Sequence, residues 1–407
     1  MIDNKTINKL LPDISDFLSK LLKFPSTSGK EHQAMEFLYE QFIKFKNVQV
    51  EKVFLSDKIK DDEDYSSPIP DIKYDGRFNL RIFRKGNSSE KKILLNAHVD
   101  VVPASEGMQN AFDGKFENGI FYGRGSCDDK GSVATIYFLF RLLEDLNIKL
   151  PGDLIAHLVV EEENGGNGSL AMARTNEKAD CCVVLEPTEF NILTSIRGAV
   201  WFKIEFFGKA GHSGQAGKTR SALLMAHTAI TTLTQYHKEL LANSRGIALF
   251  DKYENPMPIT FGRLQAGNWP ASAPSAAVLE GVLGFLPNKT KEQICSELRD
   301  VLLTQFNSYE FRLIFTYRHN CSVTNSQQKF VQELLGANKS TNINSEIDAM
   351  PASCDAWFYN NQLGIPTAVY GPGTLKVAHS KDEYIKLSDI VDAAKALLIF
   401  SKKFLGN

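Results

Sequence analysis

The sequence lacks the features that mark several large classes of protein. Its 46 lysines and arginines are balanced by 48 aspartates and glutamates, giving a formal net charge of -2. This leaves none of the basic excess that is typical of nucleic-acid-binding proteins. The strongest apolar runs, at 154–160 and 181–185, have the length of strands and fall far short of the ~20 residues that cross a bilayer. We therefore expect a protein that binds neither nucleic acid nor membrane.

The chain also lacks a disulfide framework and several common catalytic motifs. Its six cysteines follow no regular spacing, and the N-terminus has no cationic start before an apolar core. Free thiols without a signal peptide predict a cytoplasmic protein. There is no dinucleotide glycine fingerprint and no phosphate loop, and the segment GNGSL has Gly168 where a serine nucleophile would stand.

The length and the apolar pattern predict two domains. A chain of 407 residues exceeds the ~250–300 at which one core stops growing. Buried strands alternating with helices predict an α/β domain with a mixed, mostly parallel sheet flanked by helices. Alternating strands at 199–210 and 276–287, with helices at 219–241 and 289–306, predict a smaller α+β domain inserted within it. The first domain's expected helices are 7–24, 31–46, 131–146, 326–336 and 387–404, and its buried strands 91–103, 153–160 and 181–185.

Acidic and imidazole side chains follow the predicted buried strands, at the edge where α/β sheets hold their sites. Each alone has an ordinary explanation, such as a hydrogen-bonded histidine or a solvated acidic turn. The same placement after successive strands favours one shared site. The side chains are His98, Asp100, Asp128, Asp129, Glu161–Glu163, Glu186 and, near the C-terminus, His379.

Two histidines with several carboxylates form a mixed nitrogen and oxygen ligand set. Such a set suits Zn²⁺, Mn²⁺ or Co²⁺ in a hydrolytic site that keeps one position open. There are enough ligands for two ions, which a shared carboxylate could hold ~3.5–4 Å apart. One further carboxylate must stay off the metals to accept the proton of the water. The adjacent glutamates at 161–163 could divide these roles, and the residues alone leave the division open.

Six segments match a known family in order: HVDVVPA (98–104), GRGSCDDKG (123–131), EEENGG (161–166), LEPT (185–188), GHSG (211–214) and AHSKDEYI (378–385). The sequence resembles the M20 metallopeptidase/amidohydrolase family, which includes acetylornithine deacetylase, succinyl-diaminopimelate desuccinylase, aminoacylase and carboxypeptidase G2. The resemblance implies a zinc-peptidase-like catalytic domain formed by 1–193 and 315–407. It also implies a lid and dimerisation domain at 194–314, and hence a homodimer.

The resemblance further implies two divalent metal ions, zinc first, with cobalt or manganese as alternatives. One ion would be held by His98, Asp128 and Glu186, and the other by Asp128, Glu163 and His379, so that Asp128 bridges them. A water between the metals would then attack the carbonyl of the substrate.

The resemblance also assigns the remaining catalytic and substrate-binding roles. Glu162 would be the general base, and Asp100 would orient the ring of His98. His212 would stabilise the oxyanion from across a dimer interface. The substrate contacts that it implies are Arg197, Asn268, Gly371 and Gly373.

The chain departs from the family pattern at two places. Asp129 replaces the hydrophobic residue that usually follows the bridging aspartate, and the GRG spacing selects Asp128 as the bridge. The lid segment matches the family at Asn268 and Pro270, but Gly284 and Phe285 stand where an arginine is usual. This predicts a substrate that is less anionic or more apolar than is usual.

The predicted function is hydrolysis of the amide bond of a small N-acyl amino acid, with acetylornithine deacetylase-like activity first. The ending GIPTAVYGPG…AHSKDEYI favours this branch. Alternatives are a dipeptidase or carboxypeptidase acting on a short peptide, or a desuccinylase or deformylase of another N-acyl amine. A non-catalytic binding protein would have lost a ligand or the base. Here all are present: His98, Asp128, Glu162, Glu163, Glu186 and His379.

Overall fold

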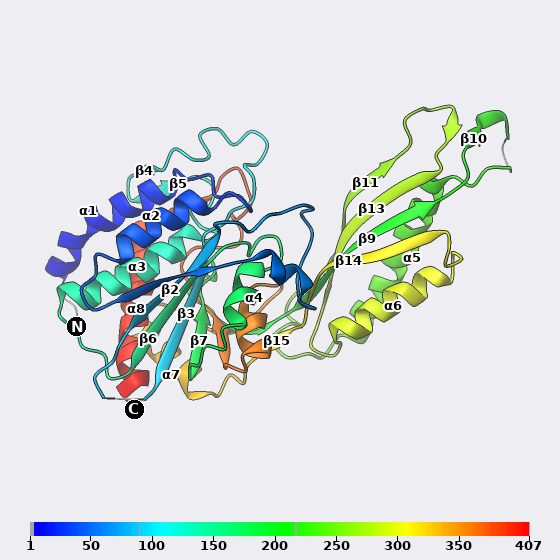
Figure 1. Cartoon of the computed structure of the whole chain (residues 1–407). Coiled ribbons are helices and arrows are strands. Elements are labelled where there is room, and N and C mark those ends of the chain that lie inside the picture. Colours follow the sequence, from blue (N-terminus) through cyan, green and yellow to red (C-terminus); the bar gives the residue numbers. More distant parts are fainter. Residues whose placement is uncertain (1–3, 89, 216–217, 407) are drawn as a thin grey trace.

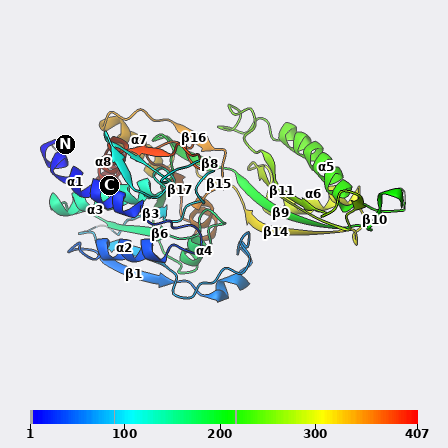
Figure 2. The ribbon, with the colours of Figure 1, turned by 90° about the horizontal axis from the view of Figure 1, so that it is seen from above.

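The computed structural model describes residues 4–88, 90–215 and 218–406 and shows two bodies side by side (Figure 1). The larger body contains both chain ends, and the smaller one is formed by the green and yellow middle of the chain. Figure 2 shows from above that the smaller body extends away from the larger one. Among the described residues, no helix is long and apolar enough to cross a membrane.

The larger body is built on a nine-stranded sheet with the order β1-β2-β6-β3-β7-β17-β8-β15, and β16 also pairs with β8. The central strands β6, β3, β7 and β17 are parallel, whereas β1, β2 and β15 pair antiparallel at the two sides. This confirms the predicted fold class. The strands are β1 (Gln49–Phe54), β2 (Phe78–Arg84), β3 (Lys92–His98), β6 (Asp153–Val159), β7 (Cys181–Val184), β8 (Ile192–Ile196), β15 (Ser322–Val323), β16 (Ile347–Met350) and β17 (Thr367–Val369).

Helices cover both faces of this sheet because its central strands are apolar on both sides. In β3, Ile93 and Leu95 pack into the main core, while Leu94 packs with Tyr359 on the opposite face. The first face carries α1 (Asn4–Leu21), α2 (His32–Phe42), α3 (Lys130–Asp145), α7 (Lys329–Ser340) and α8 (Leu387–Gly406), and the second carries α4 (Asn167–Ala173) and the short helix η3 (Phe358–Gln362). A small sheet joins β4 (Lys115–Glu117), β5 (Ile120–Tyr122) and β18 (Tyr384–Lys386), and η1 (Asp57–Asp61) lies in a loop.

The smaller body is an antiparallel sheet with two helices on one face. In β9, alternate side chains (Phe202, Ile204 and Phe206) form a core with the helices, as the period of a half-buried strand requires. The sheet order is β11 (Ile259–Ala266), β13 (Ala276–Phe285), β9 (Gly198–Phe207) and β14 (Phe311–His319), covered by α5 (Ala222–Asn243) and α6 (Lys291–Leu303). The paired strands β10 (Gly211–His212) and β12 (Ser272–Ala273), with η2 (Ser213–Gln215), lie at its far end (Figure 1).

The helices and strands expected from periodicity are all present, with ends shifted by a few residues. The sequence pattern missed β11 and β14 in the smaller body. β11 is an edge strand that is exposed along most of its length, so its sequence shows little alternation between apolar and polar residues. The short strands β4, β5, β16 and β18 and the one-turn helices were also missed, because three or four residues are too few to show a period.

The parallel strands bring the candidate residues to one edge of the sheet. His98 is the last residue of β3 and is level with Val159 of β6, so Glu161 and its neighbours follow directly beside it. Glu186 comes two residues after β7, which is paired to the other side of β3. Parallel pairing in register therefore places three separate segments at the same carboxyl edge.

A buried arginine connects this edge to the rest of the larger body. Arg77, just before β2, lies between Glu31 at the start of α2 and Glu161 after β6, with its Nη2 2.7 Å from Glu31 Oε1 and its Nη1 bonded to Glu161. All three side chains are at least 93% buried. Tyr74 and Asn167 also donate to Glu161, at 2.7 and 2.9 Å. The network fixes the turn that carries the next two glutamates.

We predict that Arg77→Ala destabilises the protein by about 3–5 kcal/mol, because it leaves two buried carboxylates without their cation. Arg174→Ala is the matched control. Arg174 also pairs with two acids, but its side chain is 39% exposed, so its loss should cost about 0–1 kcal/mol. Urea denaturation of both variants measures the difference. Equal, small losses would show that the buried pair does not hold the turn.

Candidate metal centre

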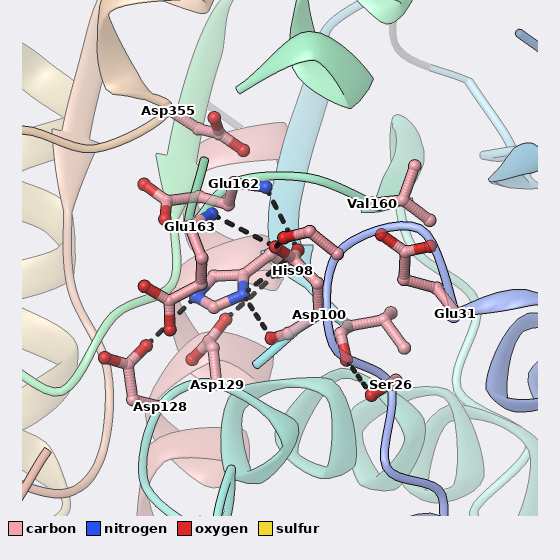
Figure 3. Close-up of polar contacts among 12 residues, drawn as sticks. Ser26, Glu31, His98, Asp100, Asp128, Asp129, Val160, Glu162, Glu163 and Asp355 are labelled. Atoms are coloured by element: carbon pink, nitrogen blue, oxygen red, sulfur yellow. Dashed lines mark hydrogen bonds and ion pairs between the residues drawn. The ribbon is translucent and has the colours of Figure 1, made fainter. Parts of the chain in front are cut away.

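His98 lies in the middle of the residues drawn in Figure 3. It is 2% exposed, and its Nε2 lies 3.0 Å from Oδ1 of Asp128. Its Nδ1 lies 3.0 Å from the carbonyl oxygen of Asp100 and 3.5 Å from that residue's Oδ1. A contact of this kind at one ring nitrogen fixes the ring and leaves the other nitrogen free for a metal. Asp100 thus does lie where the sequence analysis expected, and its backbone makes the closer contact.

Asp128 lies between the two histidines. Its second oxygen, Oδ2, is 3.2 Å from Nε2 of His379, and the same nitrogen is 3.0 Å from Oε1 of Glu163. Asp128 therefore belongs to two groups whose ligand atoms all lie within 4.8 Å of one another: His98, Asp128 and Glu186, and Asp128, Glu163 and His379. These are the two ligand sets that the family resemblance implies.

The backbone at Asp128 is held by a residue to which the sequence analysis gave no role. Oε1 of the buried Glu383 accepts the N–H groups of Cys127 and Asp128, both at 3.1 Å. Arg124, 1% exposed, donates to the other oxygen of Glu383. Glu383 lies within the quoted segment AHSKDEYI, but a sequence gives no sign that this glutamate reaches back more than 250 residues.

The neighbouring Asp129 turns away from this position. Its Oδ2 accepts the backbone N–H of His98 at 3.2 Å, and it precedes the first residue of α3. It is fully buried, and burial raises its pKa well above the usual value. The carboxylate beside both imidazoles is therefore that of Asp128, the residue that the GRG spacing selects.

Three consecutive glutamates have three different environments. The carboxylate of Glu161 forms the ion pair with Arg77. The carboxylate of Glu162 accepts no hydrogen bond from the described residues, whereas Glu163 contacts His379. Asp100 holds the two together, because its Oδ1 and Oδ2 accept the backbone N–H groups of Glu162 and Glu163 at 3.0 and 3.1 Å. This second task of Asp100 could not be read from the sequence.

The centre has the chemistry of a divalent cation site. Burial and the negative charge of Asp128 raise the pKa of Glu163 to about 7. Burial and the charges of Asp129 and Glu162 raise the pKa of Glu186 well above its usual range. Like the carboxylate of Glu162, that of Glu186 accepts no hydrogen bond from the part of the chain that the structure describes. A divalent cation would neutralise these crowded carboxylates, which have few hydrogen-bond donors near them. The two imidazoles supply nitrogen ligands, so the residues fit two such ions.

Two further residues beside Glu162 were not identified from the sequence. Asp355 lies near Glu162 in Figure 3 and accepts the hydroxyl of Ser169 at 2.6 Å, and burial raises its pKa to about 7. Tyr317, two residues before the end of β14, donates to Ser353 Oγ at 2.9 Å, and the charge of Glu162 adds to burial in raising its pKa. Neither residue directly follows a recognisable buried strand, which was the signal used for the other acids.

Arg197 lies between β8 and β9, where the two bodies meet. Its Nε donates to the carbonyl of Pro351 at 2.7 Å and its Nη1 to that of Gly198 at 3.2 Å. No carboxylate among residues 4–88, 90–215 and 218–406 forms an ion pair with it. A side chain at position 284 would clash with its guanidinium, since a Cβ there would lie 2.4 Å from Nη1. Gly284, at the position where the family usually has an arginine, thus makes room for Arg197.

The glycines at 371 and 373 lie in a turn that packs against the centre. The N–H of Gly371 donates to Thr188 Oγ1 at 3.0 Å, and its carbonyl accepts from the same hydroxyl at 3.3 Å. A Cβ on Gly371 would lie 2.6 Å from the carbonyl oxygen of Glu186, and one on Gly373, whose φ is +82°, would lie 2.5 Å from Cys127 Sγ. The structure thus shows that Gly371 packs closely against Glu186, and its role as a substrate contact stays a prediction.

His212 and Asn268 do not join the centre within one chain. His212 is in β10, at the far end of the smaller body (Figure 1). It is exposed, and its Nδ1 accepts the N–H of Gly214 at 3.1 Å. Asn268 is also exposed, on the segment between β11 and β12. Both are therefore separated from the metal ligands of their own chain.

Comparison with known proteins gives a consistent result. The model of peptidase family M20/M25/M40 matches residues 94–403. An N-formyl-4-amino-5-aminomethyl-2-methylpyrimidine deformylase from Bacillus subtilis is 26% identical over 361 residues, covering 80% of this chain and 83% of the relative. An acetylornithine deacetylase from Proteus mirabilis is 25% identical over 396 residues, covering 94% and 95%.

The fold is shared with solved structures. The dipeptidase Dug1p from Saccharomyces cerevisiae superposes with a TM-score of 0.80 at 14% identity, covering 99% of this chain and 98% of the other. The family match spans more than three quarters of the chain and includes His98, Asp128, Glu163, Glu186 and His379. The chain belongs to peptidase family M20/M25/M40 and is a hydrolase that acts on carbon–nitrogen bonds.

Proposed function

We propose that the protein hydrolyses the amide bond of a small N-acyl amino acid, with two divalent metal ions as cofactors. The proposal rests on the position of Asp128, which belongs to both ligand groups. Beside it, Glu163 contacts His379, while Glu162 keeps a carboxylate that is free to accept a proton. His98 and Glu186 complete one group, and Glu163 and His379 the other. Zinc suits this nitrogen and oxygen set, and so do cobalt and manganese.

When bound, the ions would polarise the amide carbonyl and lower the pKa of the attacking water. Glu162 accepts a proton from this water as the oxygen bonds to the amide carbon. It then returns the proton to the amine nitrogen as the C–N bond breaks, so that a carboxylic acid and an amine leave. Asp100 places Glu162 for this task by holding the backbone N–H groups of Glu162 and Glu163.

Arg197 supports an amino-acid substrate. A partly buried guanidinium at the junction of the two bodies, with no carboxylate partner among the described residues, is suited to bind one carboxylate. The usual lid arginine is replaced by Gly284, so we infer one charged contact here rather than two. The likeness to the acetylornithine deacetylase from Proteus mirabilis agrees with this choice. Asn268, Gly371 and Gly373 stay proposed substrate contacts. Because Asn268 is separated from the metal ligands of its own chain, it would act from a partner subunit.

We predict that N-acetyl amino acids are hydrolysed faster than N-formyl amines, N-succinyl amino acids or dipeptides when Zn²⁺, Mn²⁺ or Co²⁺ is added. With the best substrate, Glu162→Gln should lower kcat by about 10²–10⁴-fold, the usual contribution of a general base, while the metal content stays unchanged. Lys9→Gln, on the exposed face of α1, is the control and should retain full activity. Activity on none of these amides, or a fully active Glu162→Gln, would contradict the proposal.

We further propose that the protein is a homodimer formed through the smaller body, which acts as a lid. The edge strand β11 pairs only with β13 among the described strands, and a free edge invites pairing with another chain. Large apolar side chains are exposed nearby, with Leu224 of α5 at 66% and Trp269 at 67%. A dimer would let His212 reach the centre of the partner subunit and stabilise the oxyanion.

Mixing two inactive variants tests this arrangement. We predict that His212→Ala and Glu162→Gln are each nearly inactive, and that a purified heterodimer of the two recovers about half the activity of the wild type. One of its two sites then has both residues intact, because a symmetric dimer exchanges them between chains. If His212 acted within its own chain, the heterodimer would stay inactive. A control heterodimer of Glu162→Gln with Glu162→Ala should show no recovery.

We also propose a cytoplasmic location. All six cysteines are free in the structure, four of them buried, as is usual in a reducing compartment.

A further inference from the structure

A second cavity lies at the opposite edge of the main sheet from the metal centre. Its volume is about 360 Å³, and it is bounded by the segments 46–49, 83–87 and 147–150. Arg84 ends β2 and is level with Leu154 at the start of β6, so the cavity lies at the amino ends of the parallel strands. The seven residues of β3 separate the two edges by about 20 Å. A ligand here cannot contact the reacting atoms.

The charge of this cavity is strongly one-sided. Its lining includes four cationic side chains and no carboxylate: Lys46, Arg84, Lys85 and Lys149. The three lysines are exposed, and none has an ion pair in the described part of the chain. Two acids outside the lining contact its backbone: Glu144 accepts the N–H of Lys46 and Asp153 that of Gly86, both at 2.9 Å. A net positive charge therefore remains in a concave site.

Arg84 is the buried cation of this cavity. It is 6% exposed, and its Nη2 donates to the carbonyls of Leu143 and Ile148, at 3.5 and 3.1 Å. Its Nη1 is buried and has no hydrogen-bond partner among the residues that the structure describes. Burial lowers the pKa of Arg84, and Glu144 only partly opposes this effect. A buried cation without a carboxylate is costly unless an anion comes close to it.

The walls are fixed by backbone hydrogen bonds. The N–H of Asn87 donates to the carbonyl of Leu150 at 3.0 Å, and that of Ser88 to the carbonyl of Pro151 at 2.9 Å. Gly86 packs so closely on Gly152 that a Cβ there would lie 2.3 Å from its carbonyl carbon. The third wall is held by the pairing of Gln49 with Phe83 between β1 and β2. The cavity is thus preformed, which lowers the cost of binding.

From these contacts we propose that this cavity binds a small molecule bearing a phosphate or diphosphate group. Lysine ammonium groups and an arginine guanidinium are the usual partners of phosphate oxygens. Three asparagine side chains in the lining supply further donors, and Val48, Phe83 and Leu150 offer an apolar wall for the rest of such a molecule. The cavity can hold more than a single phosphate ion, and its concave shape suits a small ligand rather than a flat macromolecular surface.

Calorimetric titration of the metal-loaded protein with inorganic phosphate and with ADP tests the proposal. We expect saturable binding to the wild type and a loss of affinity of about tenfold or more in Lys85→Glu/Lys149→Glu, because two attractive charges become repulsive. The control, Lys9→Glu/Lys339→Glu, makes the same change in net charge on exposed positions of α1 and α7. It should alter affinity by less than about twofold, since charges beyond a Debye length are screened.

Phosphate groups can also bind metal ions. All these variants keep the same metal centre, so phosphate binding there is the same in each. A difference in affinity between variants therefore comes from the cavity. Amide hydrolysis should be unchanged in Lys85→Glu/Lys149→Glu. ADP binding tighter than phosphate would identify an organic phosphate as the ligand, and equal affinities would identify the free ion. If neither probe binds saturably, or if the control variant weakens binding equally, the proposal is wrong.

Discussion

The structure depends on holding several carboxylates close together in a buried space. Asp128, Asp129 and Glu186 are 7, 0 and 4% exposed, and Glu163 lies beside them. Like charges at this density repel one another, and burial raises the pKa of most of the group. Two imidazoles offset only part of this charge. The centre is therefore arranged to be completed by cations, and the surrounding structure serves to keep its acids in place.

Three kinds of support oppose this repulsion. Parallel strands in register fix the segments that carry the ligands, since His98 ends β3 and the glutamates follow β6. Carboxylates that do not face the centre hold backbone N–H groups, as Asp100 does for two glutamates and Glu383 for Asp128. Buried arginines pair with two buried acids next to the ligands, Arg77 with Glu161 and Arg124 with Glu383. These supports also explain the different roles of three consecutive glutamates. Arg77 pairs with Glu161, and Asp100 holds the backbone of Glu162 and Glu163 so that their carboxylates face the centre.

The sequence predicted the fold class and the identity of the residues that meet at the centre. Those residues directly follow apolar strands or lie in motifs, so local pattern was enough to find them. The second task of Asp100 and the role of Glu383 escaped prediction because each depends on backbone groups brought near only by the fold. Asp355 and Tyr317 carry no local signal at all. Arg197 was identified from its motif, but only the close approach of Gly284 shows why its guanidinium has room to lie there.

The central claim is that Asp128 is shared by two metal ions. Elemental analysis of protein loaded with Zn²⁺ and freed of excess metal tests it most directly. The wild type should hold two ions per chain, Glu186→Ala and Glu163→Ala should each hold about one, and Asp128→Ala should hold almost none, since it removes a ligand from both groups. If Asp128→Ala retained one tightly bound ion, or if the wild type bound only one, the account of a shared carboxylate would be contradicted.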